Sequence, residues 1–184
     1  MKQKFYYLLL FFFIVCMGSC NKDDLIQIFP GDNEKVIDVK MYDVGLKFYL
    51  QNEQGEPVTT FKEGENFSIC WSMTNYRESQ LYLDNYFPPE EIGNIYTSDG
   101  VLIGKADGFS GIYPEMMYYI IDPKETISCS YYWMDSEVYI QQPLSRGNYY
   151  IGFSYSFDLS KYKDKHYKDA ITEKKDFRIY FTVE

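Results

Sequence analysis

The chain is poor in the residues that most catalytic and metal sites require. Its 184 residues include a single histidine, His166, and four cysteines, Cys16, Cys20, Cys70 and Cys129. Cys70 and Cys129 do not have the close spacing of a zinc site, and neither an HExxH nor a GxSxG sequence occurs. We therefore expect no metal ion, no cofactor and no nucleophilic catalytic residue.

The chain also has too few basic residues to bind nucleic acid. Lysine and arginine number 18 against 27 acidic residues, which gives a net charge of −9. Nucleic-acid binding needs a basic face that neutralises phosphates. We expect no nucleic-acid partner.

No hydrophobic run is long enough to cross a bilayer. The longest, "FYYLLLFFFIVCM", spans the 13 residues 5–17, whereas a transmembrane helix needs about 20. Lys2 and Lys4 precede the run, and small residues follow it. This pattern predicts a signal peptide over residues 1–19.

The residues after the run identify the kind of signal. Gly18-Ser19-Cys20 resembles the lipobox of bacterial lipoproteins. The resemblance implies cleavage before Cys20, attachment of diacylglycerol to its thiol and acylation, commonly with palmitate, of the new amino terminus. The chain is then expected to be held at a membrane by its acyl chains, because two or three such chains anchor stably. Cleavage leaves 165 residues with a net charge of −11, since Lys2 and Lys4 are removed.

The segment after Cys20 bears on where the protein is displayed. Lys22-Asp23-Asp24 resembles the surface-export signal of lipoproteins from Bacteroidota, which implies an outer-membrane, surface-exposed protein; a solvated linker is the alternative. Residues 20–35 are interpreted as a tether with a reach of about 45–50 Å. Within them, Leu25–Phe29 could form a first strand or a patch that docks on the domain.

From Val36 onward, apolar residues recur with a period of two, which predicts β-strands. We expect one domain over 36–184, an all-β, antiparallel, Ig-like sandwich of about 8–10 strands. Beyond the alternating stretch 36–50, strands are expected within 67–73, 80–87, 93–105, 116–121, 125–134, 137–142, 146–157 and 177–183.

Two breaks in the strand pattern call for interpretation. The alternation changes register at Tyr42-Asp43, which suggests a bulge or a strand that switches sheets. Residues 159–173 carry apolar residues at three- and four-residue spacing and form the one expected helix.

The alternation also bears on a disulfide. Cys70 falls on the polar side of its strand, whereas Cys129 alternates with Ile127 and Tyr131 on the core side. Opposite faces seldom bring two Cα atoms within bridging distance. A Cys70–Cys129 disulfide is therefore unlikely on this pattern, although an exported compartment would permit one.

The stretches "FKEGENFSICWSMTN", "SDG" and "PLSRGNYYIGFSY" together resemble Ig-like domains of Bacteroidota lipoproteins. They are also faintly similar to the intracellular proteinase inhibitor domain of Bacillus. The shared features are a strand that ends in Asn75, a hairpin around Gly100, and Gly147 followed by Tyr149. Val101-Leu102-Ile103 stands where a tryptophan is expected nearby, which argues against an inhibitory function.

Two functions stay open, and a third, a purely architectural accessory of a larger envelope complex, is hard to distinguish from the first. The favoured one is a non-catalytic binding or interaction module, with exposed aromatic residues for a glycan or protein ligand. The alternative is a small glycan-active envelope enzyme with a carboxylate site, for which Glu90-Glu91 and the pair Asp122 and Glu125 are candidates. A calcium ion on "SDG", "ADG" or "PGDNE" is possible, but none has EF-hand spacing.

The segment 159–175 is the predicted binding loop. It holds six lysines against three acidic residues and joins two strongly alternating stretches. Loops mounted this way often carry recognition, and lysines steer anionic partners. The candidate residues are Tyr162, Lys163, Lys165, His166, Tyr167 and Lys168.

Replacing Cys20 with serine tests the lipid anchor. The Cys20→Ser variant should accumulate with its leader uncleaved and should incorporate no labelled palmitate, because serine offers no thiol for diacylglycerol. Metabolic labelling and immunoblotting measure both effects. Labelled palmitate in the Cys20→Ser chain would contradict the assignment.

Overall fold

The computed structural model describes residues 24–84, 90–106, 118–134, 141–158 and 172–184. Within these ranges the chain forms twelve strands and one 3-10 turn, η3 (Glu90–Gly93), and no α-helix. The strands build a six-stranded sheet, a four-stranded sheet and a two-stranded ribbon. The prediction of an all-β sandwich is confirmed, although with more strands than the expected 8–10.

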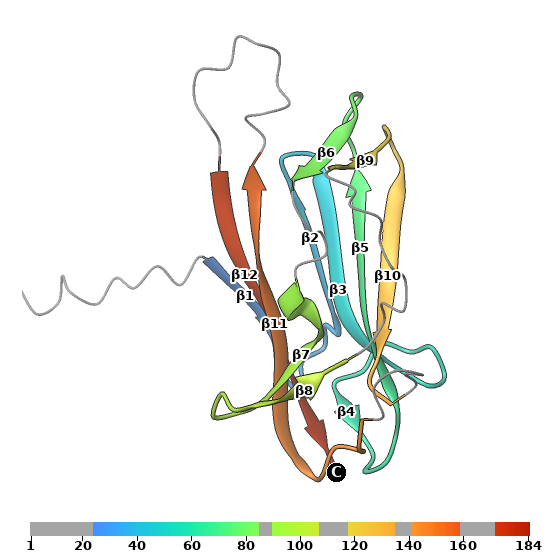
Figure 1. Ribbon diagram of the computed structural model, residues 1–184, viewed down its shortest axis with the longest axis vertical. Coiled ribbons are helices and arrows are strands. Elements are labelled where there is room, and N and C mark those ends of the chain that lie inside the picture. Colours follow the sequence, from blue (N-terminus) through green and yellow to red (C-terminus); the bar gives the residue numbers. More distant parts are fainter. Residues whose placement is uncertain (1–23, 85–89, 107–117, 135–140, 159–171) are drawn as a thin grey trace, which may run out of the picture.

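The two main sheets face each other (Figure 1). The large sheet has the order β1 (Leu25–Ile28), β12 (Thr172–Val183), β11 (Gly147–Asp158), β7 (Asn94–Thr97) and β8 (Leu102–Lys105), and β4 (Thr60–Phe61) also pairs with β12. The small sheet has the order β10 (Thr126–Tyr132), β5 (Phe67–Asn75), β3 (Val44–Asn52) and β2 (Val36–Met41). The ribbon of β6 (Leu81–Asp84) and β9 (Tyr118–Ile121) lies at one end.

The order of six strands can be compared with that of immunoglobulin-type sandwiches. Strands β3, β5 and β10 take the places of A, B and E, and β7, β11 and β12 take those of C, F and G. The sheets are not purely antiparallel as expected, because β1 and β4 both pair with β12 in parallel.

The longest pairing joins β11 and β12 over twelve residue pairs. The residues buried on one side of β11 are Tyr149, Ile151, Phe153 and Phe157. Those buried on the same side of β12 are Phe177, Ile179, Phe181 and Val183. Because side chains alternate along a strand, the residues between them point away from the core. The predicted register of both strands is confirmed.

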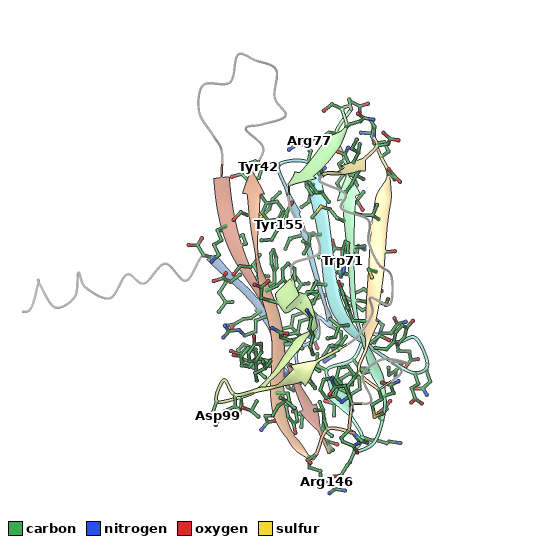
Figure 2. All side chains as sticks on the ribbon, viewed as in Figure 1. Tyr42, Trp71, Arg77, Asp99, Arg146 and Tyr155 are labelled. Atoms are coloured by element: carbon green, nitrogen blue, oxygen red, sulfur yellow. The ribbon has the colours of Figure 1, made fainter. Side chains whose placement is uncertain are left out.

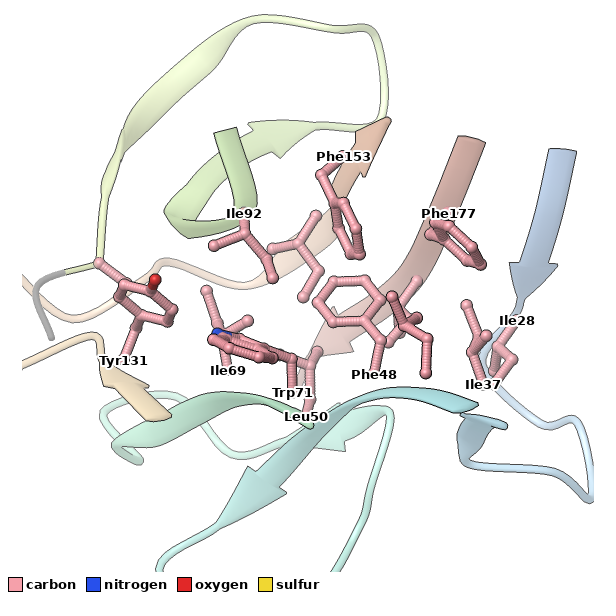
Figure 3. Packing of buried hydrophobic residues seen from close by; sticks show 14 of the residues in the cluster. Ile28, Ile37, Phe48, Leu50, Ile69, Trp71, Ile92, Tyr131, Phe153 and Phe177 are labelled. Atoms are coloured by element: carbon pink, nitrogen blue, oxygen red, sulfur yellow. The ribbon is translucent and has the colours of Figure 1, made fainter. Parts of the chain in front are cut away.

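The core lies between the two sheets (Figure 3). Phe48 of β3 meets Phe153 of β11 edge to face at 4.9 Å between ring centroids, and Phe153 stacks on Phe177 of β12 at 5.1 Å. Trp71 of β5 is also buried in this layer. Burial of such large aromatic side chains, at about 25 cal/mol per Å² of apolar surface, is the main force that holds the sheets together.

The interpretation of Tyr42-Asp43 as a bulge or sheet switch was wrong. Val44 pairs with Met41, so β2 and β3 form a hairpin with these two residues as its loop. Both adopt positive φ, 53° and 59°. Two-residue hairpin loops favour this left-handed backbone because it matches the twist of the strands. A two-residue loop changes the register of the apolar positions in the same way as a bulge does. The sequence pattern alone therefore did not distinguish the two.

The folded part of the chain begins earlier than the expected boundary at residue 36. Leu25–Ile28 form β1, whose inward residue Ile28 is buried against Ile179. The interval 20–35 is therefore not a tether throughout. Of the two alternatives for this stretch, the first strand is the one observed.

The expectations for 137–142 and 159–173 fall largely on residues outside the described ranges. In the described part, Gln141 and Gln142 belong to no strand, and Thr172 and Glu173 begin β12 rather than ending a helix. The segment 159–175 therefore includes four strand residues.

Tyr149 fixes the entry of the chain into β11. Its hydroxyl donates a hydrogen bond to the carbonyl of Ser145 over 2.7 Å, four residues upstream. This is the tyrosine-corner arrangement of immunoglobulin-type sandwiches, in which a tyrosine near the start of strand F holds the preceding crossover. Leu144, one residue earlier, is buried beneath the same corner.

Asn75 fixes the opposite end of the sandwich. Its side chain is fully buried, and its Nδ2 donates to the carbonyls of Ser79 at 2.8 Å and Ile121 at 3.0 Å. Its Oδ1 accepts a hydrogen bond from the backbone N–H of Arg77 at 3.0 Å. One amide thus joins the end of β5 to the following loop and to β9.

Truncating this amide should destabilise the fold. Asn75→Ala leaves several buried backbone groups without partners, and we expect the free energy of unfolding to fall by about 2–4 kcal/mol. Urea denaturation measures the loss. The matched control is Asn148→Ala, at an exposed position on β11, which should cost less than about 0.5 kcal/mol. Equal losses for the two variants would contradict the role given to Asn75.

Candidate functional site

The two outer faces of the sandwich differ in chemistry. The face of the small sheet carries mainly hydroxyl, charged and amide side chains, on β5 Ser68, Ser72 and Thr74, on β10 Thr126, Ser128 and Ser130, and on β3 Lys47 and Gln51, together with Tyr49 and Tyr132. The face of the large sheet instead carries a row of aromatic side chains. A solvated face needs no aromatic rings, so the large sheet holds the stronger candidate for a binding surface.

We call this row the aromatic ladder and define it as Phe29, Tyr180, Tyr150 and Tyr96. Tyr150 of β11 is in register with Tyr180 of β12 and with Tyr96 of β7, and Phe29 directly follows β1. The ring centroids lie 4.7 Å apart for Phe29–Tyr180, 5.6 Å for Tyr180–Tyr150 and 5.1 Å for Tyr150–Tyr96. The ladder therefore crosses the large sheet from β1 to β7.

The rings of the ladder form two stacked pairs, Phe29 with Tyr180 and Tyr150 with Tyr96, and the contact between Tyr180 and Tyr150 is tilted by 49°. The planes of Phe29 and Tyr180 differ by 8°, and those of Tyr150 and Tyr96 by 12°. Within each stacked pair one ring covers a face of the other, an arrangement worth about 0.5–1.5 kcal/mol per pair beyond burial.

Exposed aliphatic residues extend the ladder onto the β7–β8 hairpin. Leu102 is paired with Tyr96, and Val101, Leu102 and Ile103 are exposed by 57%, 54% and 45%. The hairpin turns at Asp99-Gly100 as predicted, with Gly100 at φ 90°. Three adjacent exposed apolar residues beside an aromatic row form a patch of the kind that marks interaction sites.

Arg178 lies within the ladder face. Its guanidinium is 4.7 Å from the ring centroid of Tyr150 and 5.9 Å from that of Tyr180, and its Nη1 donates to the Tyr180 hydroxyl at 3.1 Å. Cation–π contacts of this kind are worth about 0.5–1 kcal/mol at exposed sites. The hydrogen bond with Tyr180 is the main cause of a raised pKa for Arg178.

Gly152 leaves room for this arginine. It is paired with Arg178, and a Cβ at this position would lie 2.5 Å from the carbonyl oxygen of Phe177. No side chain fits there, so the guanidinium can lie across β11 towards Tyr150. The glycine in the middle of an otherwise strand-favouring stretch thus shapes the ladder face.

The residues predicted for the anchor and the binding loop lie mostly outside the described part. Cys20, Lys22 and Asp23 fall there, as do Tyr162, Lys163, Lys165, His166, Tyr167 and Lys168. Asp24 is described, and its carboxylate pairs with Lys175 of β12 at 3.2 Å. One ion pair thus joins the predicted export signal, through Asp24, to the last residue of the predicted binding segment, Lys175.

Cys70 and Cys129 are free thiols in the structure. They lie on neighbouring strands but one residue out of register, since Cys129 pairs with Trp71 and Cys70 with Ser130. Their side chains therefore point to opposite faces of the small sheet. Cys70 is nonetheless buried, and burial raises the pKa of its thiol.

Of the carboxylates considered for catalysis, Glu91 is exposed in η3, whereas Asp122 and Glu125 make local hydrogen bonds. Asp122 accepts a hydrogen bond from Gln80 Nε2, and Glu125 accepts one from the backbone N–H of Asp122 within the same turn. Asp99 accepts from the Thr97 hydroxyl, and Asp32 from the N–H of Phe29. Among the residues that the structure covers, no group of three potential ligands is placed to hold a metal ion.

A polar cluster bridges the sheets at the end that holds Asn75, and we call it the clasp. The hydroxyl of Tyr42 donates to Glu173, which also pairs with Lys175 at 2.7 Å. Figure 2 shows Tyr42 and Tyr155 between the sheets at this end, with Arg77 nearby. The hydrogen bond from Lys175, followed by that from Tyr42, lowers the pKa of Glu173.

No protein-family model, no curated protein and no solved structure matches the chain. Within the described ranges, no helix is long and apolar enough to span a membrane.

The clasp should make the free energy of unfolding depend on pH. The pKa of Glu173 is lowered from its ordinary value of 4.5, so its contribution is full above pH 4.5 and is lost as the pH falls through the lower folded value. Urea midpoints of wild type and Glu173→Gln should therefore differ at pH 7 and converge in acid. Glu56→Gln, in an exposed turn, should show no such convergence. A pH-independent difference for Glu173→Gln would contradict the role of its charge.

Proposed function

We propose that the chain is a lipoprotein of the cell envelope, anchored to the outer membrane through Cys20 and displayed at the surface, and that it is a non-catalytic interaction module. Its ladder face binds a protein partner. The observation that carries the proposal is the row of Phe29, Tyr180, Tyr150 and Tyr96 on the outer face of the large sheet, next to exposed Val101-Leu102-Ile103.

The composition of this face favours a protein partner. Tyrosine and arginine are enriched at the energetically dominant positions of protein interfaces, because each combines apolar area with hydrogen-bonding capacity. The ladder offers three tyrosines and Arg178, and the rings are held in place by stacking before any partner arrives. A pre-ordered surface loses little conformational entropy on binding.

A glycan ligand is supported less well by the same geometry. Sugars stack on the open face of an aromatic ring, but Phe29 with Tyr180 and Tyr96 with Tyr150 form stacked pairs, in which one face of each ring is covered by its neighbour. Phe29, at the edge of the sheet and 43% exposed, is the ring best placed to offer an open face.

The proposed anchor would hold this surface close to the membrane. With β1 starting at Leu25, only residues 21–24 separate Cys20 from the sheet, a reach of about 15 Å when extended. This is much shorter than the 45–50 Å expected from a tether of residues 20–35. A partner within the envelope surface, rather than one far outside it, suits such a short connection.

Photocrosslinking in intact cells tests the ladder face directly. A photoreactive phenylalanine at Asn148, on the ladder face, should yield a discrete protein adduct on the mature chain. The same residue at Ser128, exposed on the small sheet, should yield none. The adduct at Asn148 should disappear in Tyr96→Ala/Tyr150→Ala, because that pair removes the middle of the ladder.

The control is the fold of the double variant, checked by its urea midpoint. Both tyrosines point outward, so the variant should lose about 1–3 kcal/mol and stay folded. Adducts of equal yield at Asn148 and Ser128, or adducts that survive the double substitution, would contradict a partner on the ladder face.

A further inference from the structure

Arg178 is the one feature of the ladder face that stacking alone does not account for. Stacking and cross-strand packing explain the aromatic rings, but they do not require a full positive charge among them. Within the described part of the chain, the guanidinium forms no ion pair with a carboxylate. An arginine without a carboxylate partner is notable in a chain of net charge −9.

The nearest acidic residue on the same face is already engaged elsewhere. Asp176 lies two positions before Arg178 on β12 and points to the same side. Its carboxylate accepts a hydrogen bond from the Ser154 hydroxyl at 2.5 Å and pairs with Lys174 at 3.8 Å. Asp176 thus forms its hydrogen bond and ion pair with residues other than Arg178, although its charge adds to the raised pKa of the guanidinium.

The guanidinium is nevertheless held in a defined position. The guanidinium lies over the ring of Tyr150, its Nη1 donates a hydrogen bond to the Tyr180 hydroxyl, and its cross-strand neighbour Gly152 carries no side chain. Arginine has five N–H donors in a planar fork that matches a carboxylate in two parallel hydrogen bonds. With Nη1 turned to Tyr180, the remaining donors are available to a partner.

We propose that the protein partner presents a carboxylate, from an aspartate or glutamate, to Arg178, and that apolar side chains beside it pack on the ladder and on Val101-Leu102-Ile103. This inference rests on the proposed function and adds the chemistry of the partner. Arg178 is then the residue that selects for charge, while the ladder supplies apolar contact. A partner with a basic or neutral residue at this point would leave the guanidinium covered and unpaired, which is costly.

Peptide selection on the full chain, purified in detergent, tests the proposal. Random twelve-residue peptides displayed on phage are selected against wild type and counter-selected against Tyr96→Ala/Tyr150→Ala, which retains only ladder-dependent binders. These should carry Asp or Glu next to aliphatic or aromatic residues. Their affinity should fall about tenfold or more in Arg178→Gln, as expected for loss of a charged hydrogen bond, and should not change in Arg146→Gln.

Arg146 is a suitable control because it is an exposed arginine that pairs with Glu63 at 3.1 Å near the start of β11. A charge exchange provides a readout that a purely structural role of Arg178 would not move. Arg178→Glu should reject the acidic peptides and accept versions in which the acidic residue is replaced by lysine. Urea midpoints of Arg178→Gln and Arg178→Glu confirm that each variant is folded.

The outcomes separate the two proposals. Ladder-dependent peptides that lack acidic residues, or that bind Arg178→Gln as well as wild type, would overturn the role of Arg178 and leave the ladder face as a protein-binding surface. The absence of any ladder-dependent peptide would overturn both. Tight, Arg178-dependent binding of hexuronate oligosaccharides in place of peptides would overturn the assignment of the carboxylate to a protein.

Discussion

The register of β11 against β12 is the constraint on which the rest of the structure depends. Over twelve paired residues it places one set of side chains, including Phe153 and Phe177, in the core and the alternate set, including Tyr150 and Tyr180, on the outer face. A slip of one residue would exchange the two sets and expose the core residues to water. The hydrophobic core therefore fixes the ladder, although the ladder takes no part in it. Gly152 restricts the pairing further, since a side chain there would meet the backbone of β12.

Sequence patterns were sufficient to predict the strands in which buried and exposed side chains alternate strictly. Strongly alternating stretches such as 146–157 and 177–183 predicted both the strands and their buried sides. Patterns failed where a different interaction decided the outcome. A positive-φ loop at Tyr42-Asp43 gives the same change of register as a bulge, and the difference lies in the pairing of Met41 with Val44. For Leu25–Phe29 the sequence left a first strand and a docking patch open, because so few residues carry too little periodicity to decide, and the strand forms because β12 offers it an edge.

The ladder could have been found in part from the same patterns. Once Tyr149 and Phe177 are assigned to the core, Tyr150 and Tyr180 must point outward, and outward tyrosines on long strands are candidates for contact with a partner. What the sequence could not show is that Tyr96 and Phe29 join the same row, because this depends on strand order between distant segments. The lysine-rich segment 159–175 was predicted as the binding loop from its charge. The ladder, in contrast, is formed by the order of the strands in the sheet. The proposed role of Arg178 likewise depends on a structural fact, namely that Asp176 pairs with Lys174 and accepts a hydrogen bond from Ser154.

The parallel pairing of β1 with β12 has a mechanical consequence for a domain held by its amino terminus. With a lipid on Cys20, a pull between the membrane and a bound partner would act on β1 from the end at Leu25, while the carboxyl end of β12 lies at the opposite end of the pair. Such a load runs along the strands and is shared by the hydrogen bonds between them, rather than opening them one at a time. The ion pair between Asp24 and Lys175 stands where the load enters the sheet. If β1 detached from β12, Phe29 would leave the ladder with it. The mechanical link to the anchor and the binding of the partner would then be weakened together.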